Sequence, residues 1–135
     1  MATAFTLEAF VKAPALDRAR AVEHGLPIKA LRDLIADPAI TLADLIRVIA
    51  PRRTLERRLK ERGRLNARES DRLSAFVTIL DTVTTMFGSR QEAMAWLRRP
   101  KRQFDGASPI DMMMTNAGAH AVDELLMRAR FGMLA

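Results

Sequence analysis

The sequence offers few residues that could carry out catalysis. It has no cysteine and two histidines, and neither His24 nor His120 has a metal-spaced pair of carboxylates beside it. The chain also lacks a Walker loop, a glycine-rich dinucleotide turn that follows a strand, and a nucleophile elbow. We therefore predict no catalytic residue, no metal ligand and no cofactor, and we expect that the protein is not an enzyme.

Positive charge is concentrated in one stretch of the chain. Residues 47–72 contain ten basic and four acidic side chains, so this stretch carries the whole net charge of +6. The remaining twelve basic and twelve acidic side chains balance each other. A local basic patch on an otherwise neutral protein favours a polyanionic partner.

The basic stretch includes the segment PRRTLERRLKER, which follows TLADLIRVI after a short turn. Two helices joined in this way, the second one rich in arginine, are typical of a helix-turn-helix DNA-binding motif. On a helical wheel Leu55 and Leu59 form the buried side, and the opposite side presents basic groups that suit base edges and phosphates. The predicted DNA-binding residues are Arg52, Arg53, Arg57 and Lys60.

Other interpretations of these arginines remain open. An outward-facing basic side chain can also belong to a solvated surface that has no partner. Arg52, Arg58 and Arg62 flank the buried side of the helix and are less free to contact DNA. For Arg58 and Arg62 we favour ion pairs with acidic residues at the start of the next helix, Glu69 and Asp71, because a partly buried arginine is seldom left unpaired.

Helices must position these side chains, because no segment alternates with period two and β-branched residues are sparse. We therefore predict an all-α fold. Gly25 is expected to end an early helix, and Pro27 is expected in the first turn of the next one. Polar residues followed by an acidic residue or a helical run predict helix starts, and the expected N-caps are Thr41, Asn66, Ser89, Ser108 and Thr115.

The sequence also predicts where the protein resides. No segment approaches the roughly 20 apolar residues that span a bilayer. The first residues, MATAFTLEAFVKAPALDRAR, lack the basic start and the apolar run of a secretory signal. Leu55 and Leu59 form too narrow an apolar face for a helix that lies on an anionic membrane. We expect a cytoplasmic protein with no membrane partner.

The chain closes with RARFGMLA, although most termini are polar. This apolar tail either folds back beneath Trp96, the only tryptophan, or contacts a partner. Trp96 itself is expected in the core. The run Met112–Met114 is a second apolar group, and three adjacent residues of one helical turn cannot all point inward. Methionine suits adaptable binding surfaces, so we predict that at least one of the three faces a partner or a subunit contact.

Three segments in order carry a resemblance to a known family: GLPIKALRDLI, RTLERRLKERGRLNARESDRL and FGSRQEAMAWLRRPKRQFDGASPIDMMMTNAGAHAVDELLMRARFG. From about Gly25 to its end, the chain resembles the MbcA/ParS/Xre family of antitoxins from type II toxin–antitoxin pairs. The most specific residues are Trp96, Leu97, Pro100, Gly106, Pro109, Thr115, Gly118, Val122, Leu126 and Gly132. The chain departs from the family at Ala50-Pro51, where a small polar helix cap is usual.

The resemblance implies a helix-turn-helix-type N-terminal region followed by a small helical toxin-binding module. We expect a helical arm over residues 1–25, the DNA-binding region over 26–88 and the toxin-binding module over 89–135. In this family the partner toxin has a RES domain, which resembles ADP-ribosyltransferases and acts on NAD. The antitoxin blocks the toxin by direct contact and commonly binds its own promoter. The predicted toxin-binding residues are Met112, Met113, Met127, Arg128, Arg130, Phe131, Gly132, Met133, Leu134 and Ala135.

Two partners beyond the toxin are expected. Helix-turn-helix proteins usually read two half-sites as two-fold dimers, so operator DNA and a second copy of the chain both follow. The apolar side chains of the arm could form the homodimer contact, and they are Phe5, Leu7, Phe10 and Val11. For the tail, our hypothesis is that Phe131, Met133 and Leu134 plug the NAD pocket of the toxin or its mouth. The alternative is a stand-alone DNA-binding transcription regulator without a toxin partner.

Overall fold

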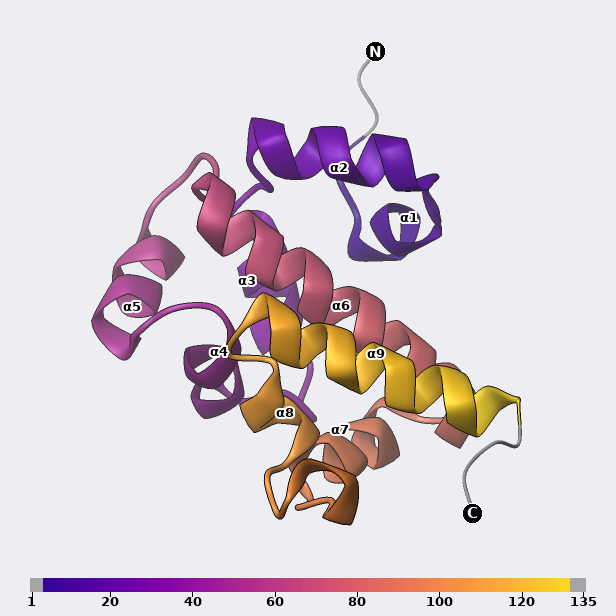
Figure 1. Ribbon diagram of the computed structural model, residues 1–135. Coiled ribbons are helices and arrows are strands. Elements are labelled where there is room, and N and C mark those ends of the chain that lie inside the picture. Colours follow the sequence, from indigo (N-terminus) through magenta and orange to yellow (C-terminus); the bar gives the residue numbers. More distant parts are fainter. Residues whose placement is uncertain (1–3, 132–135) are drawn as a thin grey trace.

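A computed structural model describes residues 4–131 (Figure 1). Within these residues the chain forms helices and no strand, which confirms the all-α prediction. In chain order the elements are α1 (Leu7–Lys12), α2 (Ala15–His24), α3 (Lys29–Ile35), α4 (Leu42–Val48), α5 (Arg52–Lys60), α6 (Ala67–Phe87), α7 (Arg90–Arg98), the 3-10 helix η1 (Arg102–Phe104), α8 (Pro109–Met112) and α9 (Asn116–Arg130).

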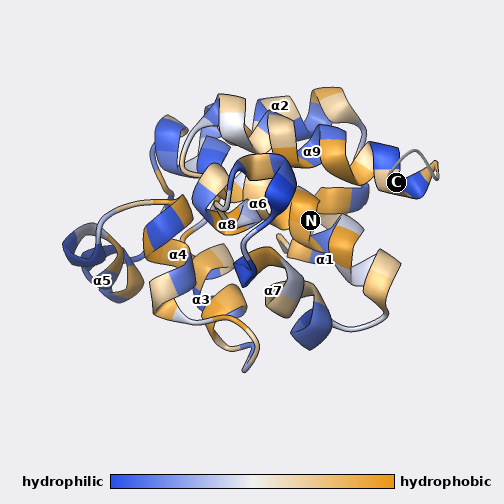
Figure 2. Ribbon diagram, turned by 60° about the horizontal axis from the view of Figure 1, so that its bottom comes forward, coloured by the Kyte–Doolittle hydropathy of each residue, from blue (hydrophilic) through white to orange (hydrophobic). Residues whose placement is uncertain are grey.

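The long helix α6 lies at the centre, and α1, α2, α4, α7 and α9 all pack against it (Figure 1). Its buried side chains include Leu73, Phe76, Leu80 and Val83. These positions are three or four residues apart, so they form one apolar stripe along the helix. The helix-turn-helix region and the C-terminal helices therefore share a single core. By contrast α5, at the left edge of Figure 2, is largely hydrophilic.

Polar side chains begin the helices where the sequence predicts. Thr41 and Asn66 form complete capping boxes with Asp44 and Glu69, in which each side chain bonds the backbone of the other residue. Single caps begin three more helices, at Ser89, Ser108 and Thr115. The helix α5 follows Pro51 and has no side-chain cap, so its first N–H groups stay open to solvent or a ligand.

Backbone pairing joins the segment before α3 to the segment after α5. Leu65 donates its N–H to the carbonyl of Leu26 at 2.8 Å, and Ile28 donates to Gly63 at 2.9 Å. Pro27 forms an isolated antiparallel bridge with Arg64. The expectation that Pro27 lies in the first turn of a helix is therefore wrong, because this bridge holds it in extended pairing and α3 begins at Lys29.

Gly25 ends α2 immediately before this paired segment. Its φ is +98°, and a Cβ placed on it would lie 2.6 Å from the carbonyl oxygen of Leu65. Only glycine fits both the positive φ and the close backbone. The residue therefore lets α2 end where the segment after α5 passes.

The N-terminal arm folds onto its own chain. Phe10 is 5% exposed and belongs to the core, and its ring lies 5.8 Å from that of Phe5. Leu7 and Val11 are half-buried and pack against the same core. The sequence suggested that these side chains contact a second copy. They pack against their own chain instead and are not free for that contact. Among residues 4–25, Leu16 on α2 is the large apolar residue that remains exposed.

Among residues 4–131, no helix is both long enough and apolar enough to cross a membrane.

Candidate functional site

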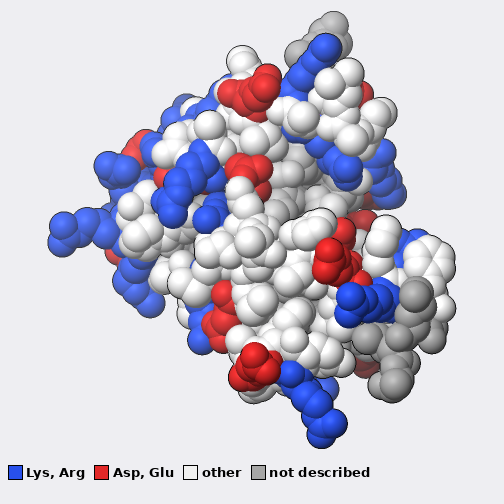
Figure 3. Space-filling model, in the orientation of Figure 1, with Lys and Arg blue, Asp and Glu red and all other residues white. Residues whose placement is uncertain are grey.

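The helix α5 presents basic side chains to solvent on the side away from its buried leucine. Leu55 is buried against the core, and the four basic residues predicted to bind DNA all lie exposed: Arg52, Arg53, Arg57 and Lys60. Figure 3 shows lysine and arginine gathered on the left of the molecule, over α5 and the start of α6. The predicted side chains are therefore together on one accessible surface.

Weak ion pairs within α5 hold two of these arginines. Arg52 lies 3.4 Å from Glu56, and Arg57 lies 3.4 Å from Glu61, each across one helical turn and with more than half of the arginine exposed. Such exposed pairs contribute roughly 0.3 to 0.5 kcal/mol. A phosphate would displace them at little cost, so the pairs leave the arginines available.

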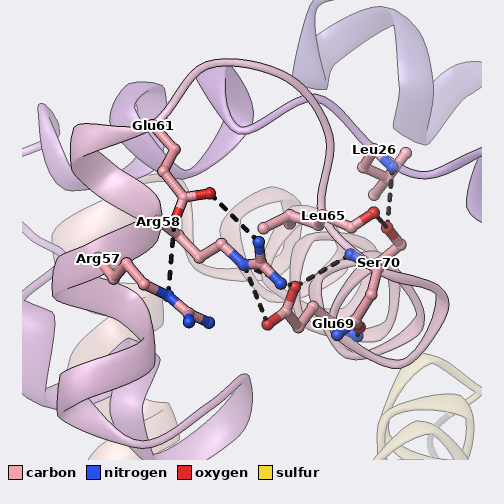
Figure 4. A network of polar contacts seen from close by, with 8 residues as sticks. Leu26, Arg57, Arg58, Glu61, Leu65, Glu69 and Ser70 are labelled. Carbon is pink, nitrogen blue, oxygen red and sulfur yellow. Dashed lines mark hydrogen bonds and ion pairs between the residues drawn. The ribbon is translucent and has the colours of Figure 1, made fainter.

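Arg58 has a different role, as Figure 4 shows. Its Nε lies 3.1 Å from Oε1 of Glu69, and its Nη1 lies 3.4 Å from Oε2 of Glu61. Because Glu69 is buried and also caps α6, Arg58 anchors α5 to the start of α6. The preferred ion pair is confirmed for Arg58. It is wrong for Arg62, which is exposed and has no ion pair among the described residues.

A buried serine completes this junction (Figure 4). The hydroxyl of Ser70 accepts the N–H of Leu26 at 2.8 Å and donates to the carbonyl of Leu65 at 3.5 Å. Arg32 of α3 also donates to the carbonyl of Leu59, near the end of α5, at 3.4 Å and to that of Glu61, the residue after α5, at 3.0 Å. These bonds satisfy buried backbone groups and fix where α5 stands relative to α3 and α6.

An ion pair connects α4 to α7. Nη2 of Arg98 lies 2.6 Å from Oδ2 of Asp44, and Nε lies 3.0 Å from Oδ1. Burial by itself raises the pKa of Asp44, but hydrogen bonds from Arg98 and Thr41 outweigh burial, so the pKa lies below its ordinary value of 3.8. The carboxylate thus stays charged while it caps α4 and holds α7.

Trp96 lies half-buried at the end of α7 and packs against the core. Its ring lies 6.1 Å from that of Phe87, and Nζ of Lys101 stands 4.6 Å from the ring centroid. Burial, and then the charge of Arg99, lower the pKa of Lys101. The expectation of a core tryptophan therefore holds in part, because Trp96 packs against the core but stays half-buried, with Lys101 over its ring.

The three methionines at the end of α8 point in different directions. Met113 is 1% exposed, Met114 is 56% exposed, and Met112 is half-buried. The expectation that one of the three faces outward is correct. However, the structure corrects the choice of Met113 as a surface contact, because its side chain fills the core, and Met114 is the exposed one.

The close approach of α8 and α9 fixes this arrangement. A Cβ on Gly118 would lie 1.7 Å from the carbonyl oxygen of Met112. No side chain fits there, so the first turn of α9 can rest directly on the backbone of α8. Sequence reasoning placed Gly118 in a motif but gave it no physical role.

The end of α9 carries an apolar surface. Met127 is 55% exposed and Phe131 is 70% exposed, and with Glu124 and Arg128 they line a shallow hollow of about 230 Å³. Arg130 is also exposed, but it lines a separate hollow with residues of α6 that include Asp81 and Met86. Phe131 does not lie beneath Trp96 as core, so the packing alternative is wrong for this residue. The predicted contacts Gly132, Met133, Leu134 and Ala135 lie outside the described residues.

Comparison with known proteins decides the family. Residues 17–77 match a model described as the antitoxin Xre-like helix-turn-helix domain, and residues 82–132 match the antitoxin Xre/MbcA/ParS C-terminal toxin-binding domain. The chain belongs to the Xre/MbcA/ParS antitoxin family. The first family domain contains α3, α4 and α5, and the second contains α7, α8 and α9. The resemblance seen in the sequence and the two-part architecture are thereby confirmed.

Three curated relatives, each named antitoxin Xre, belong to the same family. The Pseudomonas putida protein is 36% identical over 62% of this chain and 53% of its own length. The Photorhabdus laumondii protein is 28% identical over 84% of this chain and 78% of its own. The Yersinia enterocolitica protein is 27% identical over 82% and 76%. The chain thus spans about half of the first relative and about three quarters of the others.

Proposed function

We propose that this chain is the antitoxin of a type II toxin–antitoxin pair, whose C-terminal module binds a cognate toxin and blocks its active site. The observation that carries the proposal is the exposed apolar end of α9, formed by Met127 and Phe131, within the segment matched by the toxin-binding model. Contiguous apolar patches on a protein surface mark interaction sites. The chain acts by binding, without a cofactor and without catalysis of its own.

The toxin of this proposal has a RES domain and uses NAD, by ADP-ribosyl transfer or by NAD breakdown, as the family resemblance implies. Phe131, with Met133 and Leu134 after it, enters the NAD pocket or its mouth. Burial of each such side chain contributes roughly 1.5 to 3 kcal/mol before ordering costs. Arg128 and Arg130 pair with acids of the toxin or occupy the region of the NAD phosphates.

A chain shortened to end at Arg130 tests the plug. Phe131 is largely exposed, so the shortened chain should keep its melting temperature and its DNA binding. It should lose neutralisation, measured as restored NAD consumption or ADP-ribosyl transfer and as growth arrest when both proteins are expressed. Full silencing of the toxin by the shortened chain would remove the tail from the mechanism, and unfolding would assign the tail to the core.

The antitoxin also autorepresses its operon in this proposal, through α5 and its four exposed basic residues. Replacement of Arg53, Arg57 and Lys60 by alanine should flatten the dependence of log affinity on log salt by about one unit for each lost phosphate contact. A matched control replaces three exposed arginines elsewhere, Arg20, Arg99 and Arg102. Gel shifts with the upstream DNA that do not separate the two triple variants would exclude α5 as the reader.

A stand-alone transcription regulator remains the second candidate, because the exposed basic surface of α5 needs no toxin to bind DNA. The gene next to the one that encodes this chain distinguishes the two candidate functions. An adjacent gene whose product co-purifies with this chain and arrests growth without it supports the antitoxin, and an isolated gene supports the regulator.

We further propose a cytoplasmic homodimer that forms through the N-terminal region, residues 1–25. The exposed Leu16 on α2 supports a contact there. Leu16→Glu should yield the monomer mass in size exclusion with light scattering and should leave the melting temperature unchanged. A dimer that survives this change would place the contact elsewhere.

A further inference from the structure

A small pocket lies where the two family domains meet. It is an open hollow of about 190 Å³ between α4, the turn that joins α4 to α5, the first two turns of α6 and Met114, the second residue after α8. Its lining includes Arg47, Arg68, Arg72, Ala50, Pro51 and Met114. The apolar part of the lining thus comes from α4, the turn and Met114, and the arginines come from α4 and α6.

The guanidinium groups of the pocket are only partly neutralised. Arg47 lies 3.3 Å from Asp111, with both side chains substantially exposed, and Arg72 donates to the carbonyl of Met113 at 3.4 Å. Arg68 has no ion pair or hydrogen bond among residues 4–131, and no acidic residue lines the pocket. Three arginines therefore face one neighbouring carboxylate.

This excess of donors selects the ligand. Each guanidinium carries five N–H groups in a planar fork, which matches phosphate oxygens. A carboxylate ligand would satisfy one fork, whereas a phosphate offers enough oxygens for arginines that approach from two helices. The pocket therefore suits a phosphate group better than a carboxylate.

The position of the pocket indicates the source of the phosphate. Pro51 lines the pocket and is also the N-cap residue immediately before α5. Figure 3 shows the basic surface continuing from α5 over the start of α6. Helix-turn-helix proteins orient their recognition helix by contacts to backbone phosphates beside the groove, and the pocket stands beside the first turn of α5.

We propose that this arginine pocket binds a backbone phosphate of the DNA that α5 contacts, so that Met114 places the C-terminal module within the DNA interface. The inference rests on the proposed DNA binding by α5 and adds a contact outside the helix-turn-helix. Because Arg47 is shared between Asp111 of α8 and the phosphate, bound DNA draws Arg47 away from the C-terminal module.

The decisive variant is Met114→Glu. It introduces a carboxylate at the rim of the pocket without a change to α5 or α6, and Met114 is already exposed, so the fold is retained. Met86→Glu is the matched control, because it makes the same replacement at an exposed position near the other end of α6. At about 0.1 M salt Met114→Glu should bind the upstream DNA roughly tenfold more weakly than the parent, as expected for one lost phosphate contact. Met86→Glu should bind as the parent does.

A second measurement uses the arginines. Arg68→Ala should reduce the slope of log affinity against log salt by about one unit, and Arg102→Ala, which removes an exposed arginine of η1, should not. Thermal melts check that each variant is folded. Calorimetric titration with inorganic phosphate distinguishes a free anion, since tight binding to the parent that Arg68→Ala abolishes would assign the pocket to a small anion instead of DNA.

The outcomes separate this inference from the proposed function. If Met114→Glu and Arg68→Ala bind DNA like their controls while the α5 triple variant fails to bind, the pocket is excluded and the α5 reader stands. If the parent binds no upstream DNA at all, both the proposed repression and the pocket fail.

Discussion

Arg98 of α7 and Asp44 of α4 form a two-pronged ion pair across the boundary between the two family domains, with N–O distances of 2.6 and 3.0 Å. The same guanidinium donates to the carbonyl of Ala39 at 2.7 Å. Asp44 belongs to the segment matched by the helix-turn-helix model and Arg98 to the segment matched by the toxin-binding model. One arginine thus fixes the orientation of the first helix of the motif against the C-terminal module.

Replacement of Arg98 should destabilise the whole protein. Arg98→Ala leaves the carboxylate of Asp44, whose side chain is 7% exposed, with only its Thr41 hydrogen bonds. Loss of one partner from a fully buried pair costs about 3 to 5 kcal/mol. Because Arg98 itself is 39% exposed, solvent screening reduces this, and we expect a loss of about 1 to 3 kcal/mol in the free energy of unfolding. Urea denaturation measures it, with Arg20→Ala as the control, and an equal midpoint in both variants would contradict the prediction.

The same pair predicts a dependence of stability on pH. The folded-state pKa of Asp44 lies below its ordinary value of 3.8, so the contribution of its carboxylate is fully present above that value and is lost as pH falls through the folded pKa. The difference in urea midpoint between the parent and Asp44→Asn should therefore shrink as pH is lowered from about 5 through the folded-state pKa. Asp123→Asn removes an exposed carboxylate of α9 and controls for net charge. A difference that stays constant over this range would show that the capping hydrogen bonds alone stabilise α4.

Gly118 should tolerate no side chain. A Cβ at this position meets the backbone oxygen of Met112 at 1.7 Å, and backbone gives way less easily than a side chain. We expect Gly118→Ala to cost about 1 to 3 kcal/mol as overpacking and to disturb the toxin-binding surface with it. The neighbouring Ala117→Ser, at an exposed position, is the control in thermal unfolding. An unchanged melting temperature for Gly118→Ala would mean that α8 and α9 separate freely.

The apolar end of α9 should be needed for toxin binding and dispensable for folding. Met127→Glu combined with Phe131→Glu replaces two exposed side chains, so the melting temperature should stay within about 1 °C of the parent. Each lost contact removes roughly 1.5 kcal/mol or more, which corresponds to at least a tenfold weaker complex for each position. Affinity for the cognate toxin, measured by calorimetry, checks this, with Ala19→Glu on α2 as the control. Equal affinity in all three proteins would place the contact on another surface.

Local signals predicted the helices well. Each expected N-cap, from Thr41 to Thr115, accepts the predicted backbone N–H, because capping depends on residues three positions apart and on nothing distant. The ion pair of Arg58 was also predictable, since an arginine beside the buried face of one helix needs an acid at the start of the next. Recognition of the family also rested on local segments of the sequence, including the one that contains Arg58 and Glu69 and the C-terminal one that begins at Phe87.

Tertiary packing decided what the sequence left open. Phe10 would look the same in the sequence whether it covered its own core or a second copy, and the structure places it in its own core. The choice among Met112, Met113 and Met114 depends on how closely α8 approaches Gly118, which no helical period reveals. Asp44 and Arg98 are 54 residues apart, so no sequence spacing connects them.

The backbone pairing of Leu26 with Leu65 returns the chain to one point after it has formed α3, α4 and α5. This has an evolutionary consequence. Mutations on the outward side of α5, whose main neighbour is α4, alter no packed residue, so under the proposed DNA binding by α5 the operator preference is free to drift between related operons. The helix α4, by contrast, forms ion pairs with Arg98 of α7 and with Asp111 of α8, so mutations in α4 can break either pair. We therefore expect α5 to diverge fastest among relatives, and α4 to change only together with the module that recognises the toxin.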